Sequence, residues 1–222
     1  NKVYKLSQST WSGSVKLISN NIYNITVIDD NDKLWVSGYH YGLLGHTSPQ
    51  SKDTFTIIDS GSSFKDVDSG YRHTVAIKTD GTLWVGGDNN KGQLGNGGNI
   101  DAHNLTQVGV ATNWTYCSAN NDTTFAINNL GELWATGDNS YYQLGLGHNN
   151  NINSWTKVGT DNDWKKIEGN TYSAVGIKTD GTLWGAGTSS RYYNVDITGA
   201  LHTTFYEIDS DTNWKDISTA SD

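Results

Sequence analysis

Short apolar runs separated by glycine-containing turns recur along the chain. The run from Val75 to Ile77 is apolar at every position, and so is the run from Leu83 to Val85. The segment Thr79 to Thr82 between them contains Asp-Gly, a strong signal for a hairpin because glycine adopts the positive φ that tight turns require. Successive side chains of a strand point to opposite faces, so these strands belong to a sheet that is covered on both faces.

The hairpin belongs to a repeat of about fifty residues. One landmark is a Leu-Trp pair whose tryptophans are separated by 49, 50 and 50 positions, at Trp35, Trp84, Trp134 and Trp184. A second landmark is an aromatic residue at steps of 50, at Phe64, Trp114, Trp164 and Trp214. Two independent landmarks that each return four times identify a repeat architecture.

Each repeat unit has room for four short strands. In the unit that opens at Phe64, the strand candidates are Phe64–Val67, His73–Lys78, Leu83–Gly87 and Leu105–Val108. A sheet stacked between two like sheets has both faces covered, as blades have around a propeller axis. A β-solenoid usually has a shorter period, and a sandwich does not repeat so regularly. The sequence therefore predicts an all-β propeller of four-stranded antiparallel blades.

Small residues end the tryptophan strand of every unit. They are Ser37-Gly38, Gly86-Gly87, Thr136-Gly137 and Ala186-Gly187. We interpret these pairs as positions where two backbones approach closely, since a side chain would not fit there.

The segment from Gly70 to Gly97 resembles the regulator-of-chromosome-condensation repeat. The resemblance rests on the following residues: Gly70, His73, Thr74, Ala76, Asp80-Gly81, Leu83-Trp84, Gly87, Gly92, Leu94-Gly95 and Gly97. The third repeat unit keeps Leu133-Trp134 and Gln143-Leu144-Gly145. The fourth unit has Asn194 and Val195 where the other units have Leu-Gly. The resemblance implies a seven-bladed propeller, of which this chain supplies about four blades.

The repeat also predicts how the chain is divided. The expected segments are 1–14 as the end of a preceding blade, 15–63, 64–113, 114–163 and 164–213 as blades 1 to 4, and 214–222 as the start of a further blade. Since an open propeller exposes strand edges, we expect the missing blades to come from a longer chain or, less favoured, from a neighbouring copy.

Charge and composition exclude several classes of partner. The net charge is −8 with a pI near 5.1, and the fifteen basic residues form no cluster, which argues against nucleic-acid binding. No stretch approaches the roughly 20 apolar residues of a membrane span, so we expect no membrane insertion. The single cysteine permits no internal disulfide, which by itself does not fix a cellular compartment.

Candidate chemistry is sparse. Cys117 occupies a predicted core position of a first strand, which favours a buried structural thiol over a nucleophile. The six histidines do not cluster, and no nucleophile elbow, phosphate loop or zinc-protease motif is present. The acidic loops at Asp29–Asp32 and Asp209–Asn213 leave calcium binding open. We expect no cofactor, no metal ion and no enzymatic activity.

The long loops after the tryptophan strands carry the candidate binding residues. These are Tyr39, Tyr41, Tyr141, Tyr142, Arg191, Tyr192 and Tyr193. Repeat symmetry places the loops on one rim of the propeller, and tyrosine and arginine are favoured at recognition surfaces. The alternative is packing between blades, because Tyr142 and Tyr192 stand at the position of Gly92.

Three functional hypotheses follow. The favoured one is a binding or structural module of a phage virion, such as a tail fibre or receptor-binding protein, or of a bacterial cell-surface protein, which contacts a protein or a surface glycan. The Asn-, Ser-, Thr- and Gly-rich loops and the acidic charge motivate it. The alternatives, implied by the resemblance, are a guanine-nucleotide exchange factor in the cytoplasm and a protein inhibitor of an enzyme.

Overall fold

Four antiparallel sheets of four strands each make up the computed structural model, which describes residues 14–40, 50–59, 61–188 and 200–219. Blade 1 is β1 (Val15–Asn20), β2 (Asn24–Asp29), β3 (Leu34–His40) and β4 (Gln50–Ile58). Blade 2 is β5 (Phe64–Ser69), β6 (His73–Lys78), β7 (Leu83–Gly87) and β8 (Ala102–Gln107). Blade 3 is β9 (Trp114–Asn120), β10 (Thr123–Asn128), β11 (Leu133–Gly137) and β12 (Ile152–Lys157). Blade 4 is β13 (Trp164–Gly169), β14 (Ser173–Lys178), β15 (Leu183–Thr188) and β16 (Leu201–Asp209).

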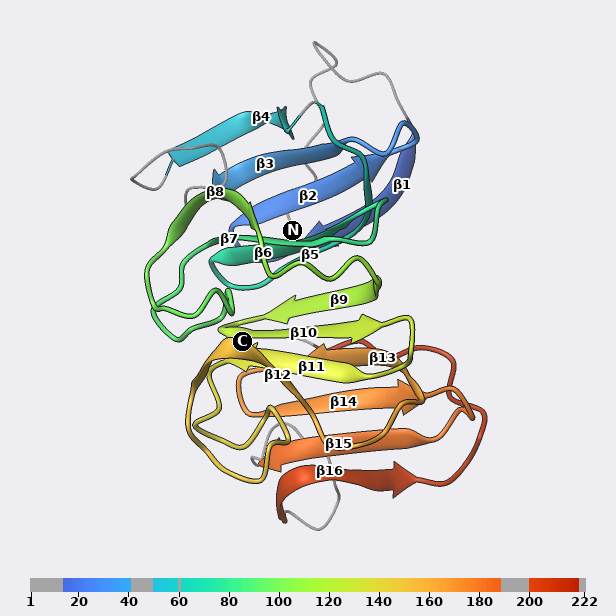
Figure 1. Cartoon of the computed structure of the whole chain (residues 1–222). Coiled ribbons are helices and arrows are strands. Elements are labelled where there is room, and N and C mark those ends of the chain that lie inside the picture. The colour runs from blue at the N-terminus through green and yellow to red at the C-terminus, as the bar shows by residue number, and fades with distance from the viewer. Residues whose placement is uncertain (1–13, 41–49, 60, 189–199, 220–222) are drawn as a thin grey trace.

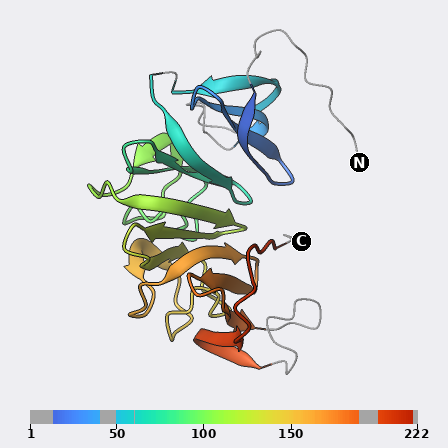
Figure 2. The same cartoon turned by 90° about the vertical axis from the view of Figure 1, so that its right-hand side faces the viewer.

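The blades are up-and-down sheets stacked face to face in an arc (Figures 1 and 2). The described residues contain no helix, so the prediction of an all-β chain with four-stranded blades is confirmed. The first strand of each blade lies innermost, since β5 packs against β1 and β2, and β9 against β5 and β6. The fourth strand lies outside and is half exposed, as the burial of β8 and β16 shows.

The tryptophan strands have the same register in every blade. Trp84 pairs with Ala76, Trp134 with Ala126 and Trp184 with Gly176. The hairpin before two of these strands is also repeated: Asp80 Oδ1 accepts the backbone N–H of Thr82 at 2.9 Å, and Thr82 Oγ1 accepts the indole N–H of Trp84 at 2.8 Å. The fifty-residue period therefore reports equivalent positions in equivalent sheets.

The hydrophobic core lies between the blades. One cluster joins Val75 and Val85 of blade 2 to Trp114 and Cys117 of blade 3. The next joins Phe125 and the neighbouring strands of blade 3 to blade 4, and a further cluster joins blades 1 and 2. Burying a large side chain contributes about 1.5–3 kcal/mol, so stability depends on the stacking of neighbouring sheets, as the runs of successive apolar residues predicted.

The glycines that end the tryptophan strands are required by backbone contact. Gly38, Gly87, Gly137 and Gly187 have φ values of 104°, 113°, 106° and 101°. A Cβ on Gly87 would lie 2.7 Å from the Cα of His73, and the other three meet the turn before the second strand in the same way. The close backbone approach that the sequence predicted is confirmed.

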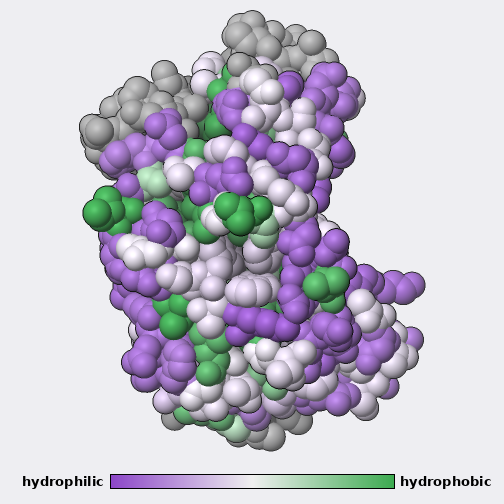
Figure 3. All heavy atoms as spheres, viewed as in Figure 1, coloured by the Kyte–Doolittle hydropathy of each residue, from purple (hydrophilic) through white to green (hydrophobic). Residues whose placement is uncertain are grey.

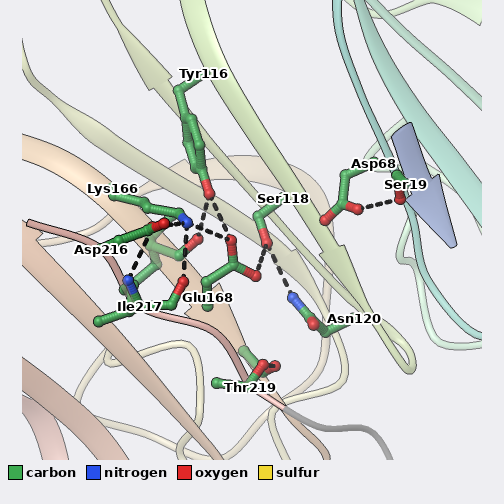
Figure 4. Close-up of polar contacts among 12 residues, drawn as sticks. Ser19, Asp68, Tyr116, Ser118, Asn120, Lys166, Glu168, Asp216, Ile217 and Thr219 are labelled. Carbon is green, nitrogen blue, oxygen red and sulfur yellow. Dashed lines mark hydrogen bonds and ion pairs between the residues drawn. The ribbon is translucent and has the colours of Figure 1, made fainter. Parts of the chain in front are cut away.

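Polar side chains join the inner strands (Figure 4). Asp66 Oδ2 accepts the backbone N–H of Cys117 at 2.9 Å, and Asp68 Oδ2 accepts that of Ala119 at 2.8 Å. Residues 214–219 form no strand, although Lys166 of β13 forms an ion pair with Asp216 and donates to the carbonyl of Ile217 at 2.8 Å. Side chains of first strands thus provide hydrogen bonds across blade boundaries in addition to apolar contact.

Candidate functional site

One rim of the arc gathers the short turns between the first and second strands and the long loops after the third strands. Antiparallel order places these connections at the same ends of the strands, on the left in Figure 1. The other rim carries the hairpins between the second and third strands, such as the turn at Asp80 and Gly81. The predicted binding residues fall on the first of these rims.

Buried asparagines fix the long loops. Asn89 Nδ2 donates to the carbonyls of Gly98 and Ile100 at 3.0 and 3.1 Å, and its Oδ1 accepts the N–H of Leu94 at 3.0 Å. Asn139 does the same in blade 3, where its Oδ1 accepts the N–H of Leu144 at 3.0 Å. These loops therefore present their exposed side chains from an ordered backbone.

The structure describes three of the seven predicted binding residues. Tyr39 is 36% exposed and Tyr141 is 41% exposed, while Tyr142 is partly buried. Tyr142 has a φ of 63° and its N–H donates to the carbonyl of Asn139, as that of Gly92 does to Asn89. Tyr142 thus takes the left-handed backbone position of a glycine, as its place in the repeat indicated. The remaining residues, Tyr41, Arg191, Tyr192 and Tyr193, lie outside the described residues.

The same rim carries three tyrosines that were not among the predicted binding residues. Tyr23, Tyr71 and Tyr172 lie in the short turns before the second strands. The ring centre of Tyr23 lies 6.0 Å from that of Tyr39 and 5.0 Å from that of Tyr71. The hydroxyls of Tyr23 and Tyr71 form a hydrogen bond of 2.8 Å. Tyr141 packs edge to face on Tyr172 at 4.8 Å. These five residues are called the tyrosine rim below.

The repeat relates only two of these three tyrosines, Tyr23 and Tyr172, which occupy the same turn position. Tyr23, Arg72, Asp122 and Tyr172 follow one another at steps of 49, 50 and 50. Tyr23, Tyr71 and Tyr172 are partly buried, and Tyr71 and Tyr172 pack on rings of neighbouring blades. Contacts between the turns of neighbouring blades depend on how the blades stack, so the sequence alone does not reveal them.

A pocket of about 290 Å³ opens on this rim between the turns of blades 2, 3 and 4. The residues that line it include Tyr71, Tyr172, Asp122 and Asp138. Gln143 Nε2 donates to Asp138 Oδ2 at 3.3 Å and to the carbonyl of Thr171 at 3.2 Å, which joins the walls. The pocket combines aromatic faces with hydrogen-bond acceptors, a composition suited to ligand recognition.

A second cavity, of about 610 Å³, lies along the inner strands. It contains Asp66, Asp68 and Glu168, and burial raises the pKa of Asp66 to about 6 and that of Glu168 to about 7. Each of these carboxylates already accepts hydrogen bonds across a blade boundary. Figure 4 shows the bond from the Tyr116 hydroxyl to Glu168, which is 2.8 Å long. Their arrangement serves to join blades.

Cys117 and the histidines offer no reactive centre in the described part of the chain. Cys117 is 3% exposed, and burial raises the pKa of its thiol, so it is the structural thiol that the sequence predicted. His73 is buried and hydrogen bonded to the Thr124 hydroxyl at 2.8 Å, and burial lowers its pKa to about 4. Residues 14–40, 50–59, 61–188 and 200–219 hold no group of three or more metal-ligating side chains.

The predicted acidic loops act as turns. Asp29 Oδ1 accepts the N–H groups of Asn31 and Lys33 at 2.9 and 2.8 Å, and its Oδ2 accepts the indole N–H of Trp35. Asp209 accepts the N–H of Asp211 in the same manner. These hydrogen bonds give the carboxylates a structural role in ordering the turns.

The outer surface is chemically mixed. Figure 3 shows a face on which hydrophobic residues are scattered among polar and neutral ones. Among the described residues, no helix is long and apolar enough to span a membrane.

Comparison with known proteins identifies the repeat. Residues 64–93 match the model of the regulator of chromosome condensation (RCC1) repeat. Human WBSCR16 has a similar structure, with a TM-score of 0.72 and 14% identity over 87% of this chain and 51% of that chain. Yeast RCC1 (Prp20), in a crystal structure with Kap60, gives a TM-score of 0.71 at 14% identity over 89% and 50%. Residues 64–93 therefore match an RCC1-type repeat, and the chain has the propeller fold of these structures.

A further yeast structure, Prp20p from Saccharomyces cerevisiae, matches this chain with a TM-score of 0.63 and 12% identity, over 90% of this chain and 64% of that one. At these identities the likeness concerns the fold. The chain spans about half the length of the first two structures that it matches. The matched repeat covers β5, β6, β7 and the first part of the loop that follows β7.

Proposed function

We propose that this propeller is a non-catalytic binding module whose tyrosine rim contacts a protein or a surface glycan. We place it in a phage virion, as part of a tail fibre or receptor-binding protein, or in a bacterial cell-surface protein. The observation that carries the proposal is the set of paired tyrosines on this rim. Tyr23 packs on Tyr39 within blade 1 and on Tyr71 of blade 2, and Tyr141 of blade 3 packs on Tyr172 of blade 4.

The order of the rim supports this role. Each tyrosine side chain has only two rotatable angles, and its partner ring restricts it further, so little conformational entropy is lost when a partner binds. The loop that carries Tyr141 is fixed by Asn139, and the N–H of Tyr141 donates to Gln143 Oε1 at 2.8 Å. A preformed aromatic surface with polar neighbours is typical of recognition sites.

We further propose that additional blades, from a longer chain or from a neighbouring copy, cover the outward face of β1. Val15, Ile18 and Ile22 are 48%, 60% and 61% exposed on and next to this strand. The corresponding face of β5 carries Val67, which is buried against its neighbours. A partner sheet would bury the apolar surface of blade 1 as blade 1 buries that of blade 2.

The test compares the chain with a rim variant on intact cells and on a glycan array. We expect Tyr39→Ala combined with Tyr141→Ala to reduce binding at least about tenfold, the loss expected for two recognition tyrosines. Leu130→Ala on the opposite rim, where Leu130 is 61% exposed, is the matched control and leaves binding unchanged. Lack of binding to every host surface, together with tight binding to a soluble cellular protein, contradicts the surface role.

An exchange factor for a small GTPase is the second candidate. The matched RCC1 repeat favours it, together with the similar structure of Prp20p, described with its binding properties to Gsp1p and histones. This candidate requires accelerated release of a fluorescent nucleotide from a GTPase when the chain is added. Unchanged release across a panel of GTPases excludes it.

A further inference from the structure

The rim pocket is formed by three successive turns, and its walls come from different blades. Tyr71 belongs to blade 2, Asn121 and Asp122 to blade 3, and Tyr172 to blade 4. The amide of Tyr71 donates to the carbonyl of Asn121 at 3.0 Å, and the side chain of Asn121 donates to the Thr171 hydroxyl. These contacts place the turns side by side. The pocket is therefore part of the blade stacking and is present before any partner arrives.

Carboxylates dominate the charge of this pocket. Burial raises the pKa of Asp122, and the nearby carboxylates of Asp88 and Asp138 raise it further. The local cations are Arg72, which lies 4.0 Å from Asp88, and Lys91. The described residues that line the pocket include two carboxylates, Asp122 and Asp138, and no lysine or arginine, in a chain whose net charge is −8.

Both aromatic walls are held by a second ring. Tyr71 packs edge to face on Tyr23 at 5.0 Å, and Tyr172 on Tyr141 at 4.8 Å. The guanidinium of Arg72 already lies 5.0 Å from the centre of the Tyr71 ring. A tyrosine face attracts a cation by about 0.5–2 kcal/mol, more when water is excluded.

We propose that this pocket binds the side chain of a lysine or arginine presented by a partner protein, with Asp122 and Asp138 as charge partners and Tyr71 and Tyr172 as flanking rings. The inference rests on the proposed binding function of the rim and specifies its partner. The volume of about 290 Å³ suits one long side chain and lies at the lower limit of small-molecule sites, ~300 Å³.

The negative charge of the pocket favours a basic side chain over a glycan as its ligand. A neutral sugar also stacks on tyrosine and donates hydroxyl groups to carboxylates. It does not relieve the repulsion among Asp88, Asp122 and Asp138. A guanidinium or ammonium group does, and hydrogen bonds between charged partners are roughly twice as strong as neutral ones. The observations therefore favour a basic protein segment.

The experiment titrates the whole chain with an acetylated, amidated Gly-Ser-Arg-Ser-Gly peptide and follows the backbone amide resonances of Asn121, Asp122 and Thr123 by NMR. The same peptide with citrulline in place of arginine has nearly the same shape without the charge. We expect the arginine peptide to bind at least about tenfold more tightly, a difference of ~1.4 kcal/mol. High salt weakens its binding because an ion pair is screened.

Charge-neutral variants locate the site. Asp122→Asn and Asp138→Asn each reduce affinity for the arginine peptide at least about tenfold and remove its preference over citrulline. Asp30→Asn is the matched control, because Asp30 is an exposed carboxylate in a turn of the opposite rim. Amide spectra of the free variants establish that each one folds, and two separate variants guard against the failure of one.

The outcomes separate this inference from the proposed function. Equal affinity for the two peptides, or a neutral oligosaccharide that binds the pocket and is indifferent to Asp122→Asn, overturns the basic-residue site. If cell binding is lost in the Tyr39→Ala and Tyr141→Ala variant but retained in Asp122→Asn, the rim function stands and this inference fails. If cell binding survives both, the rim function itself is wrong.

Discussion

Tyr116 of blade 3 donates its hydroxyl to Glu168 of blade 4 at 2.8 Å. Glu168 also accepts the Ser118 hydroxyl at 3.4 Å and lies 3.7 Å from the ammonium of Lys166 (Figure 4). Burial, together with the nearby carboxylate of Asp68, nevertheless raises the pKa of Glu168 from 4.5 to about 7. The folded chain therefore holds this proton more tightly than the unfolded chain does.

Glu168→Gln tests this linkage. A raised carboxyl pKa contributes stability that is fully present below the unfolded value of 4.5 and is lost as the pH rises through about 7. Glutamine keeps an oxygen that accepts from Tyr116 and carries no charge. Near pH 4.5, the pKa of Glu168 in the unfolded chain, we expect the variant and the parent to have the same free energy of unfolding. In mild alkali we expect that of the variant to be higher by ~2–3 kcal/mol.

Urea unfolding over a pH series provides the measurement. His73 contributes an opposite slope, because its pKa is lowered to about 4 and its stabilisation is lost as the pH falls below 6.5. That contribution is the same in both proteins and cancels in their difference. Glu207→Gln, at an exposed carboxyl of β16, serves as control. A difference for Glu168→Gln that does not change with pH contradicts the interpretation.

Gly87→Ala should destabilise the chain far more than Gly97→Ala. Both glycines have positive φ values, 113° and 88°. A Cβ on Gly87 would also lie 2.7 Å from the Cα of His73, whereas Gly97 has nothing within 4 Å of the added atom. We expect a loss of about 4 kcal/mol for Gly87→Ala, from strain and collision together, and about 1 kcal/mol for Gly97→Ala. Chemical denaturation of the pair measures both, and equal losses would show that the collision relaxes.

The fold could be predicted because its cause is local and repeated. The apolar runs around Val75 and Trp84 determine covered sheet faces, and the fifty-residue period places Trp184 where Trp84 lies two blades earlier. The same reasoning found Tyr39, near the end of β3, and Tyr141, in the loop after β11, which both lie on the rim that carries the long loops.

The binding surface was only partly predictable because its contacts cross blade boundaries. At one turn position the repeat has Tyr71, Asn121 and Thr171, so no residue type recurs to mark it. The pocket exists because three such turns lie side by side. Likewise, nothing in the local sequence of Glu168 shows that Tyr116 lies opposite, since that pairing depends on how closely two sheets stack.

Thr182→Val tests the hairpin network that the repeat carries. The Thr182 hydroxyl donates to Asp180 Oδ1 at 2.7 Å and accepts the indole N–H of Trp184 at 2.8 Å. Valine has nearly the same shape and leaves both partners without this hydroxyl. We expect a loss of about 1–3 kcal/mol in the free energy of unfolding. Thr160→Val, at an exposed turn position, is the control, and a similar effect of both substitutions would argue against the network.

Cys117 offers a direct probe of the interface between blades 2 and 3, because its thiol is buried against Val75 and Trp114 and burial raises its pKa. We expect iodoacetamide to modify the folded chain only through transient opening of this interface, so that the rate follows the free energy of opening. Trp114→Leu leaves a cavity, which should lower the free energy of opening by ~2–3 kcal/mol. The rate of modification should therefore rise by ~30–100-fold. Trp214→Leu changes the same repeat position where the ring is 40% exposed, and it should leave the rate nearly unchanged. Rapid modification of the parent chain, at the rate of the urea-unfolded chain, would mean that the inner strands do not form the tight stack on which the propeller depends.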